Sequence, residues 1–284
     1  MSIETFAALD ELRARVGGWK REGARVALVP TMGNLHAGHH SLVALAREHA
    51  DRVIASVFVN PTQFGPNEDF ASYPRTPQAD IDGLAQAGCD AAWMPDVDTM
   101  YPFGLDGAVR MRVPGVTEVL EGAHRPGHFD GVATVVARLF NQVQPDVAVF
   151  GRKDYQQLAV IRHMARDLAF PVELIAAPTL RDPDGLAMSS RNQYLSAPER
   201  GTAPVIHRAL QTMRDALLAG TPRGQVEAAA EAALRDAGFV PDYAAIRTAD
   251  LGEPGEGQSG PHVALIAARL GRTRLIDNLE FDVP

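Results

Sequence analysis

The chain has 284 residues, of which 46% are hydrophobic, and this composition predicts a globular protein large enough for two domains. Its 27 basic and 35 acidic side chains give a formal net charge of −8, which argues against binding to nucleic acid or to an anionic membrane surface. The single cysteine excludes an internal disulfide framework, and the lack of a signal segment or of an apolar run of about 20 residues favours a soluble cytoplasmic protein.

Strand and helix patterns alternate through the first 180 residues. An amphipathic lead-in helix is predicted over 3–20, and the segment 100–121 is expected to be irregular, with one strand over 109–113. The other expected elements are buried strands over 25–29, 51–59 and 147–150, further strands over 91–95 and 172–176, helices over 41–49, 73–87 and 131–144, a helix that ends at residue 168, and a loop over 121–129. This alternation predicts βαβ units and a parallel sheet.

The pattern changes after about residue 180. Long helices are predicted over 197–219 and 225–237, and strands over 243–247, 263–268 and 273–276. We therefore predict an α/β fold in which residues 1–180 form a Rossmann-like, doubly wound parallel sheet. Residues 181–284 are expected to form a smaller α+β domain that acts as a lid.

The turn Pro30–His40 is the strongest candidate site, because it lies between the strand 25–29 and the helix that follows it. Ligands of doubly wound folds bind at the carboxyl ends of the strands, and the first turn of a helix attracts phosphate. Two glycines permit close approach, and His36 and His39 can donate hydrogen bonds to a phosphate that gains charge. A structural role remains an alternative, and a zinc site would need a third ligand, whereas Cys89 is far away in sequence.

Polar residues also follow three other predicted strands. Asn60 and Gln63 can face a ligand or form an ordinary Asn-Pro turn. Lys153 can reach a phosphate or remain solvated, and Asp154 can cap the next helix. The segment Ser189–Arg191 can bind an anion or be a polar loop, and the loop 121–129 leaves the same two alternatives open.

Several of these motifs occur together in one order: 30–39, 58–64, 73–76, 125–129, 150–157 and 184–192, followed by the segment Arg274–Asn278. In this arrangement the chain resembles the pantothenate synthetase (pantoate–β-alanine ligase) family of the nucleotidylyltransferase superfamily. The resemblance implies that pantoate attacks the α-phosphate of ATP to give pantoyl adenylate and pyrophosphate. The amine of β-alanine then attacks the activated carbonyl to give pantothenate and AMP.

The resemblance also implies roles for individual residues. Gln63 is expected to bind pantoate and β-alanine, and Gln157 to bind pantoate. The ATP site is expected to comprise Met32, Gly33, Asn34, Leu35, His36, Ala37, Gly38, His39, Gly151, Arg152, Lys153, Asp154, Leu180, Met188, Ser189, Ser190 and Arg191. Of the residues implied to be catalytic, His39 is the proton donor, and the others are His36, Lys153, Ser189, Ser190 and Arg191.

The resemblance further implies Mg²⁺ with the ATP, and a homodimer. Two departures from the family pattern matter here. Arg152 stands where many relatives have an acidic residue. Ala79 stands in a group of acids implicated in magnesium binding, so only Asp80 remains of that group, and no protein ligand for the metal is assigned from the sequence.

Three rival functions can be separated by experiment. A nucleotidylyltransferase that releases a stable nucleotide product would share the histidine turn, but it would not explain Gln63 and Gln157, and it would form a dinucleotide instead of AMP. A nucleotide sensor would bind ATP without pantoate-dependent turnover. An aminoacyl-tRNA synthetase is disfavoured, because the chain is acidic and has no room for an anticodon-binding domain.

Overall fold

The computed structural model describes residues 3–66, 68 and 70–284. The chain divides into two compact units, the first comprising residues 1–152 and 160–178 and the second comprising residues 153–159 and 179–284. A domain boundary at residue 180 stays a prediction. Among the described residues, no helix has the length and apolar character needed to cross a membrane.

In the described part of the first unit, six strands form one parallel sheet in the order β1-β4-β3-β2-β5-β6. The strands are β1 (Glu4–Phe6), β2 (Val26–Thr31), β3 (Arg52–Val57), β4 (Ala91–Trp93), β5 (Val147–Gly151) and β6 (Glu173–Ala177). In the central strand, Leu28 pairs with Ile54 on one side and with Ala148 on the other.

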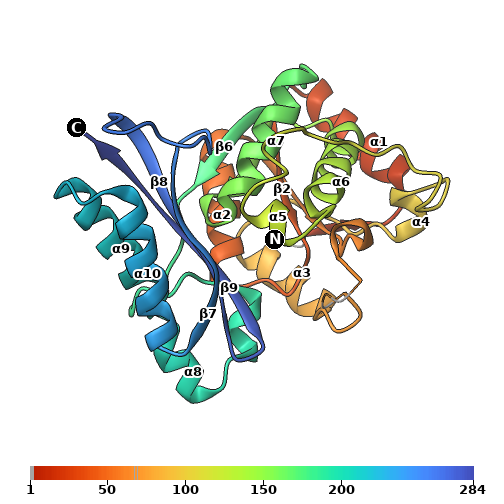
Figure 1. Cartoon of the computed structure of the whole chain (residues 1–284). Coiled ribbons are helices and arrows are strands. Elements are labelled where there is room, and N and C mark those ends of the chain that lie inside the picture. Colours follow the sequence, from red (N-terminus) through yellow and green to blue (C-terminus); the bar gives the residue numbers. More distant parts are fainter. Residues whose placement is uncertain (1–2, 67, 69) are drawn as a thin grey trace. The chain divides into compact units, whose positions relative to one another are not determined.

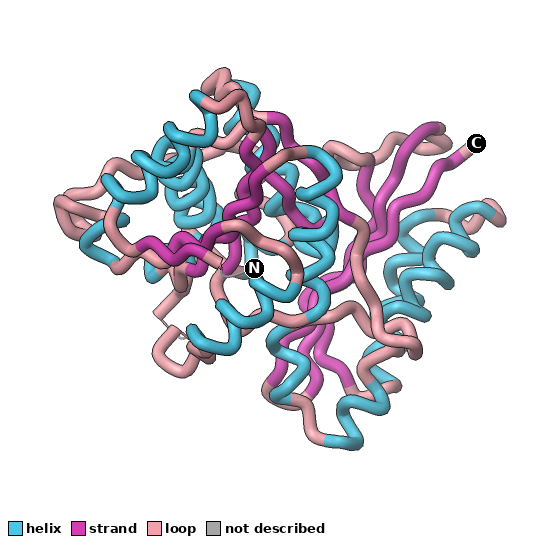
Figure 2. The backbone as a smooth tube through the Cα atoms, turned by 180° about the vertical axis from the view of Figure 1, so that it is seen from behind, coloured by secondary structure: helices cyan, strands magenta, loops and turns pink. Residues whose placement is uncertain are grey.

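Helices flank this sheet on both sides (Figure 2). They are α1 (Leu9–Arg21), α2 (Ala37–His49), α3 (Pro77–Gln86), α4 (Val97–Met100), α5 (Glu121–His124), α6 (His128–Val143) and, from residue 160 onward, α7 (Tyr155–Asp167), whose first turn belongs to the second unit. Because both faces are covered, the four residues Val26–Val29 are all fully buried and show no apolar–polar alternation. This architecture confirms the predicted α/β fold with a doubly wound parallel sheet.

The second unit contains a three-stranded antiparallel sheet in its described residues, in the order β7-β8-β9. Its strands are β7 (Phe239–Thr248), β8 (Gly260–Leu270) and β9 (Thr273–Val283). Helices α9 (Val205–Leu218) and α10 (Arg223–Asp236) pack side by side against this sheet (Figure 1), and a short helix α8 (Ala197–Thr202) precedes them. The predicted smaller α+β part of the fold is therefore confirmed.

Three sequence predictions about local elements were wrong. Residues Glu4–Phe6 form a strand because they pair with β4, so the lead-in helix begins only at Leu9. The predicted loop 121–129 contains α5 and the start of α6. The predicted helix 197–219 is interrupted at Pro204, which has no N–H group to continue the helical hydrogen bonds.

The predicted strand 109–113 was also wrong, because this segment has no strand structure. Side chains of α6 satisfy its backbone instead of a neighbouring strand. The Met111 N–H donates to Thr134 Oγ1 over 2.8 Å, and Arg138 Nη2 donates to the Val109 carbonyl over 3.3 Å. The apolar alternation in the sequence was therefore not sufficient evidence for a sheet partner.

Candidate active site

The carboxyl ends of β2 and β5 flank the point at which the order of the strands reverses. The chain runs outward from β2 to β3 and β4, and it then returns to place β5 on the opposite side of β2. Ligands of open α/β sheets bind at such switch points. Met32 and Gly33 follow β2 directly, and Gly151 and Arg152 stand at the end of β5, so these four predicted ATP-site residues share one edge of the sheet.

Asp80 fixes the turn that follows β2. Gly33 and Asn34 have φ angles of 79° and 50°, in the left-handed region. The buried Asp80 carboxylate accepts hydrogen bonds from the Asn34 N–H over 3.1 Å and from the Leu35 N–H over 2.8 Å. A Cβ atom on Gly33 would lie 2.9 Å from Asp80 Oδ2, so the close approach of the carboxylate also requires glycine.

This role of Asp80 was not recognised from the sequence, because its partners lie 45 and 46 positions away. Thr76 Oγ1 donates a third hydrogen bond to the same carboxylate over 3.1 Å. Both oxygens thus accept hydrogen bonds that hold the turn. Among the residues that the structure describes, no group of three or more His, Cys, Asp or Glu side chains is arranged to hold a metal ion.

His36 and His39 together cap the amino end of α2. His36 Nδ1 accepts from the Gly38 N–H over 3.1 Å, and His39 Nδ1 accepts from the His36 N–H over 3.3 Å. Their ring centroids lie 4.2 Å apart. Because each Nδ1 is an acceptor, each neutral ring carries its proton on Nε2 and can donate from that atom. The predicted pair of donors is therefore held at a helix end that favours anions.

His40 has a different environment. A Cβ atom built on Gly83 of α3 would lie 2.7 Å from His40 Nε2, so the ring packs closely against this helix. The Nε2 atom is buried and has no hydrogen-bond partner among the described residues. These contacts place His40 in the packing between α2 and α3, which makes it a suitable control for its neighbours.

The amide of Gln63 is held by a hydrogen-bonded network at the end of β3. Gln63 Nε2 donates to Met32 Sδ over 2.8 Å, and Asn60 Nδ2 donates to Gln63 Oε1 over 3.1 Å. Asn60 Nδ2 also donates to the Gly131 carbonyl over 3.1 Å, and its Oδ1 accepts from the Tyr101 hydroxyl over 2.6 Å. The structure thus brings together two predicted site residues, Met32 and Gln63. The roles of Tyr101 and Gly131 had no signal in the sequence, because they are distant from residue 63 along the chain.

A charged cluster adjoins Gln63 through its backbone. His128 Nδ1 lies 2.7 Å from the Gln63 carbonyl, and its Nε2 lies 3.0 Å from Arg125 Nη1. The Arg125 guanidinium donates two hydrogen bonds to Glu68, at 2.7 and 2.6 Å. Burial, with the nearby Arg125 charge second, lowers the pKa of His128 from its ordinary 6.5 to about 4. His128 is therefore neutral at pH 7 in the folded protein.

The depressed pKa of His128 predicts a loss of stability in mild acid. Between pH 6.5 and 4 the unfolded chain binds a proton at this position and the folded chain does not, so the free energy of unfolding falls as the pH falls through this window. Above pH 6.5 the residue is neutral in both states and contributes no pH dependence. We expect His128→Gln to remove on the order of 1–3 kcal/mol of the decrease between pH 7 and 4.

Urea denaturation of the wild type and of His128→Gln at a series of pH values checks this prediction. The exposed neighbour His124 provides the control variant, His124→Gln. Parallel curves for the wild type and His128→Gln would contradict the prediction.

The remaining predicted site residues belong to the second unit. Lys153 and Asp154 lie in a 3-10 turn, with Nζ and Oδ2 4.0 Å apart, and Gln157 follows on α7. The Met188 N–H donates to the Leu180 carbonyl over 3.0 Å, so these two predicted ATP-site residues are neighbours.

Ser189 caps the 3-10 helix Ser190–Tyr194. This helix contains the rest of the segment Ser189–Arg191, which is predicted to bind an anion. The Arg191 N–H donates to Ser189 Oγ over 3.3 Å. The segment Ser189–Arg191 is therefore a structured turn with two hydroxyls and one guanidinium. Its predicted role toward phosphate stays a prediction.

Comparison with known proteins identifies the family. The model of the pantoate-beta-alanine ligase family matches residues 4–280. The chain belongs to this family. A relative named pantothenate synthetase from Xanthomonas oryzae pv. oryzae (strain MAFF 311018) is 70% identical over 279 residues, which cover 98% of this chain and 100% of the relative. The predicted family is therefore confirmed.

Solved structures of the family share this fold. Pantothenate synthetase from Thermus thermophilus matches with a TM-score of 0.91 and 49% identity, covering 98% of this chain and 99% of that chain. The pantoate-beta-alanine ligase from Francisella tularensis matches with a TM-score of 0.81 and 30% identity, over 98% of this chain and 97% of that chain. The Francisella enzyme was solved in complex with Beta-gamma ATP and Beta-alanine.

Proposed function

We propose that this protein condenses pantoate with β-alanine at the expense of ATP. A pantoate carboxylate oxygen attacks the α-phosphate, and the bond to the departing pyrophosphate breaks to give pantoyl adenylate. The ammonium group of β-alanine loses one proton to give the free amine, which attacks the activated carbonyl. The bond to AMP then breaks, and the nitrogen loses a second proton and keeps one N–H in the amide. Family membership and the Francisella relative, with its ATP and β-alanine ligands, support this reaction.

The observation that carries the proposal is the histidine turn at the topological switch point. It combines the backbone N–H groups at the start of α2 with two imidazoles whose Nε2 atoms can donate. Donors fixed in advance act most strongly where negative charge develops, which here is on the phosphates as pyrophosphate departs. His39, as the proton donor, and His36 are therefore the proposed catalytic residues of the first unit.

We propose that ATP binds residues 32–39, 151–154, 180 and 188–191. Lys153 and Arg191 provide positive charge for the phosphates, and Ser189 and Ser190 provide hydroxyl donors. The amide of Gln63 binds pantoate and β-alanine, and the amide of Gln157 binds pantoate, without placing a further charge beside a carboxylate. The fixed orientation of the Gln63 amide by Asn60 supports this role.

Mg²⁺ is proposed to enter with ATP and not through a carboxylate of the protein. The Asp80 oxygens already accept three hydrogen bonds from the turn and from Thr76. Mg²⁺ commonly keeps several waters and binds substrate phosphates, so the metal can be held by the nucleotide itself. A homodimer is likewise proposed from the family resemblance.

The proposed two-step reaction predicts its own order of events. ATP and pantoate alone should support exchange of labelled pyrophosphate into ATP, because the adenylate forms before β-alanine reacts. Adding β-alanine should release AMP and pantothenate. Exchange that strictly requires β-alanine would exclude a free adenylate, and a dinucleotide product in place of AMP would overturn the proposed function.

A further inference from the structure

The segment Arg274–Asn278 of β9 resembles the family, yet the proposed reaction assigns it no role. Asp277 and Asn278 are both polar, and each is only 5% exposed. Buried polar side chains require hydrogen-bond partners, so the partners of these two residues indicate what the segment does. Successive side chains of a strand point to opposite faces of the sheet, which lets the two residues reach different parts of the unit.

Asp277 holds Arg181, which stands at the start of the turn that leads into the segment 188–191. Arg181 Nη1 donates to Asp277 Oδ2 over 2.6 Å, and Nη2 donates to Oδ1 over 2.9 Å. The same guanidinium donates to the Gly185 carbonyl over 3.0 Å, and Arg181 forms a β-bridge with Ala187. Arg181 therefore closes the turn 181–187, after which the chain enters Met188–Arg191.

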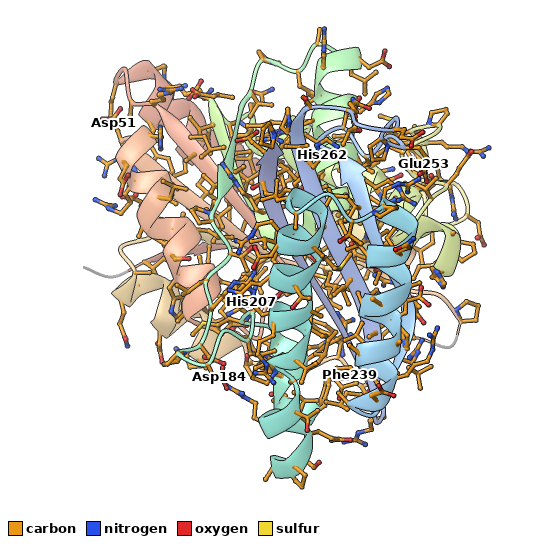
Figure 3. All side chains as sticks on the ribbon, turned by 60° about the vertical axis from the view of Figure 1, so that its left-hand side comes forward. Asp51, Asp184, His207, Phe239, Glu253 and His262 are labelled. Carbon is orange, nitrogen blue, oxygen red and sulfur yellow. The ribbon has the colours of Figure 1, made fainter. Side chains whose placement is uncertain are left out.

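The surroundings of Asp277 support this arrangement. His207 of α9 lies beside the turn that carries Asp184 and Gly185 (Figure 3), with Nδ1 3.9 Å from Asp277 Oδ2. Burial, with the nearby Arg181 charge second, lowers the pKa of His207. The Arg181 guanidinium is thus the cation that balances the buried Asp277 carboxylate.

Asn278 holds the turn Arg152–Asp154, which is the other segment proposed to contact the phosphates. Its Nδ2 donates to the Lys153 carbonyl over 2.8 Å, although the two residues are 125 positions apart in sequence. Lys153 lies in the 3-10 turn that leads into α7, so this bond fixes the backbone from which the lysine side chain extends. The Asn278 N–H also donates to Asp277 Oδ1 over 2.8 Å, which links the two residues directly.

We propose that Asp277 and Asn278 are positioning residues. As neighbours on strand β9, they hold Lys153 and the segment 188–191 at a fixed distance from each other. This inference rests on the proposed function. Groups that bind developing charge are effective only when they are held in place before the reaction, and a displacement of about 1 Å can cost 10²-fold in rate. The two segments are distant in sequence, and β9 joins them within one unit.

The test is a double-mutant cycle between Asn278 and Lys153. Single-turnover formation of the adenylate is measured for the wild type, Asn278→Ala, Lys153→Ala and the double variant. We expect Asn278→Ala to lower the rate roughly 10-fold with a smaller change in the KM for ATP. In the Lys153→Ala background the same substitution should have little further effect, since the asparagine acts through the lysine. An equal effect in both backgrounds, or a wild-type rate for folded Asn278→Ala, would overturn the inference.

Two further variants separate positioning from general stability. If Asn278→Ala does not fold, Asn278→Leu keeps about the same side-chain volume and removes the amide group, including the donor to the Lys153 carbonyl, and the same cycle applies. The ion pair between Arg274 and Asp242, at 2.7 Å, joins β9 to β7 and provides the control. Asp242→Asn should lower the melting temperature and leave the adenylation rate of the folded protein unchanged, whereas Asp277→Asn should lower both.

Failure of the wild type to exchange pyrophosphate would refute the proposed function itself, whereas wild-type exchange with a normal rate for Asn278→Ala would refute the positioning role alone.

Discussion

His39→Ala is expected to lower the rate of adenylate formation by roughly 10²–10⁴-fold, the usual range for a positioned acid or base. His39 Nδ1 accepts a hydrogen bond from the His36 N–H, so the neutral ring carries its proton on Nε2. From Nε2 this proton can be donated to a phosphate oxygen. This interaction strengthens as charge develops, so the rate should change more than the affinity for ATP. Single-turnover formation of pantoyl adenylate measures the rate, and equilibrium titration measures the affinity.

The adjacent residues provide the comparison. His36→Ala should also lower the rate, because His36 caps the helix and lies beside the His39 ring. His40→Ala should change stability more than the chemical step, because His40 packs against Gly83 of α3. A wild-type rate for His39→Ala together with a slow His40→Ala would show that the wrong histidine was assigned.

Asp80→Asn is expected to lower the rate of adenylate formation by about 10²-fold and the free energy of unfolding by about 1–3 kcal/mol. The amide that replaces the carboxylate has one acceptor oxygen, so it cannot accept from both the Asn34 and the Leu35 N–H with the geometry seen here. One of these two N–H groups then loses its partner, and the turn that leads to His36 shifts. Urea denaturation and single-turnover kinetics measure the two effects.

Two controls distinguish positioning from metal binding. Asp82→Asn changes an exposed acid of the same helix, and it should affect neither measurement. If Asp80 instead bound Mg²⁺, a higher concentration of the metal would restore the activity of Asp80→Asn, whereas we expect no such recovery. A stable and fully active Asp80→Asn would show that the turn does not need the carboxylate.

Much of the fold followed from the sequence alone. The buried strand 25–29 was predicted because a strand covered on both faces is continuously apolar, which is a local property of the chain, and Val26–Val29 are indeed fully buried. The histidine turn was also predicted, because glycines, imidazoles and the start of a helix are close together in sequence. The pairing of β1 and the absence of a strand at 109–113 were not predictable in the same way. Both depend on whether a partner is present in space.

The sequence by itself determined the family, the parallel sheet and the types of residue available for phosphate and carboxylate. Only the tertiary structure decided which residues position these groups. Asp80 holds the turn after β2, and Asn60, with its partner Tyr101, holds the Gln63 amide. Asp277 and Asn278 bind Arg181 and the Lys153 backbone. The physical reason is the range of the interactions. Periodicity, capping and turn formation act over a few residues, whereas these hydrogen bonds join groups that only the folded chain brings within about 3 Å of each other.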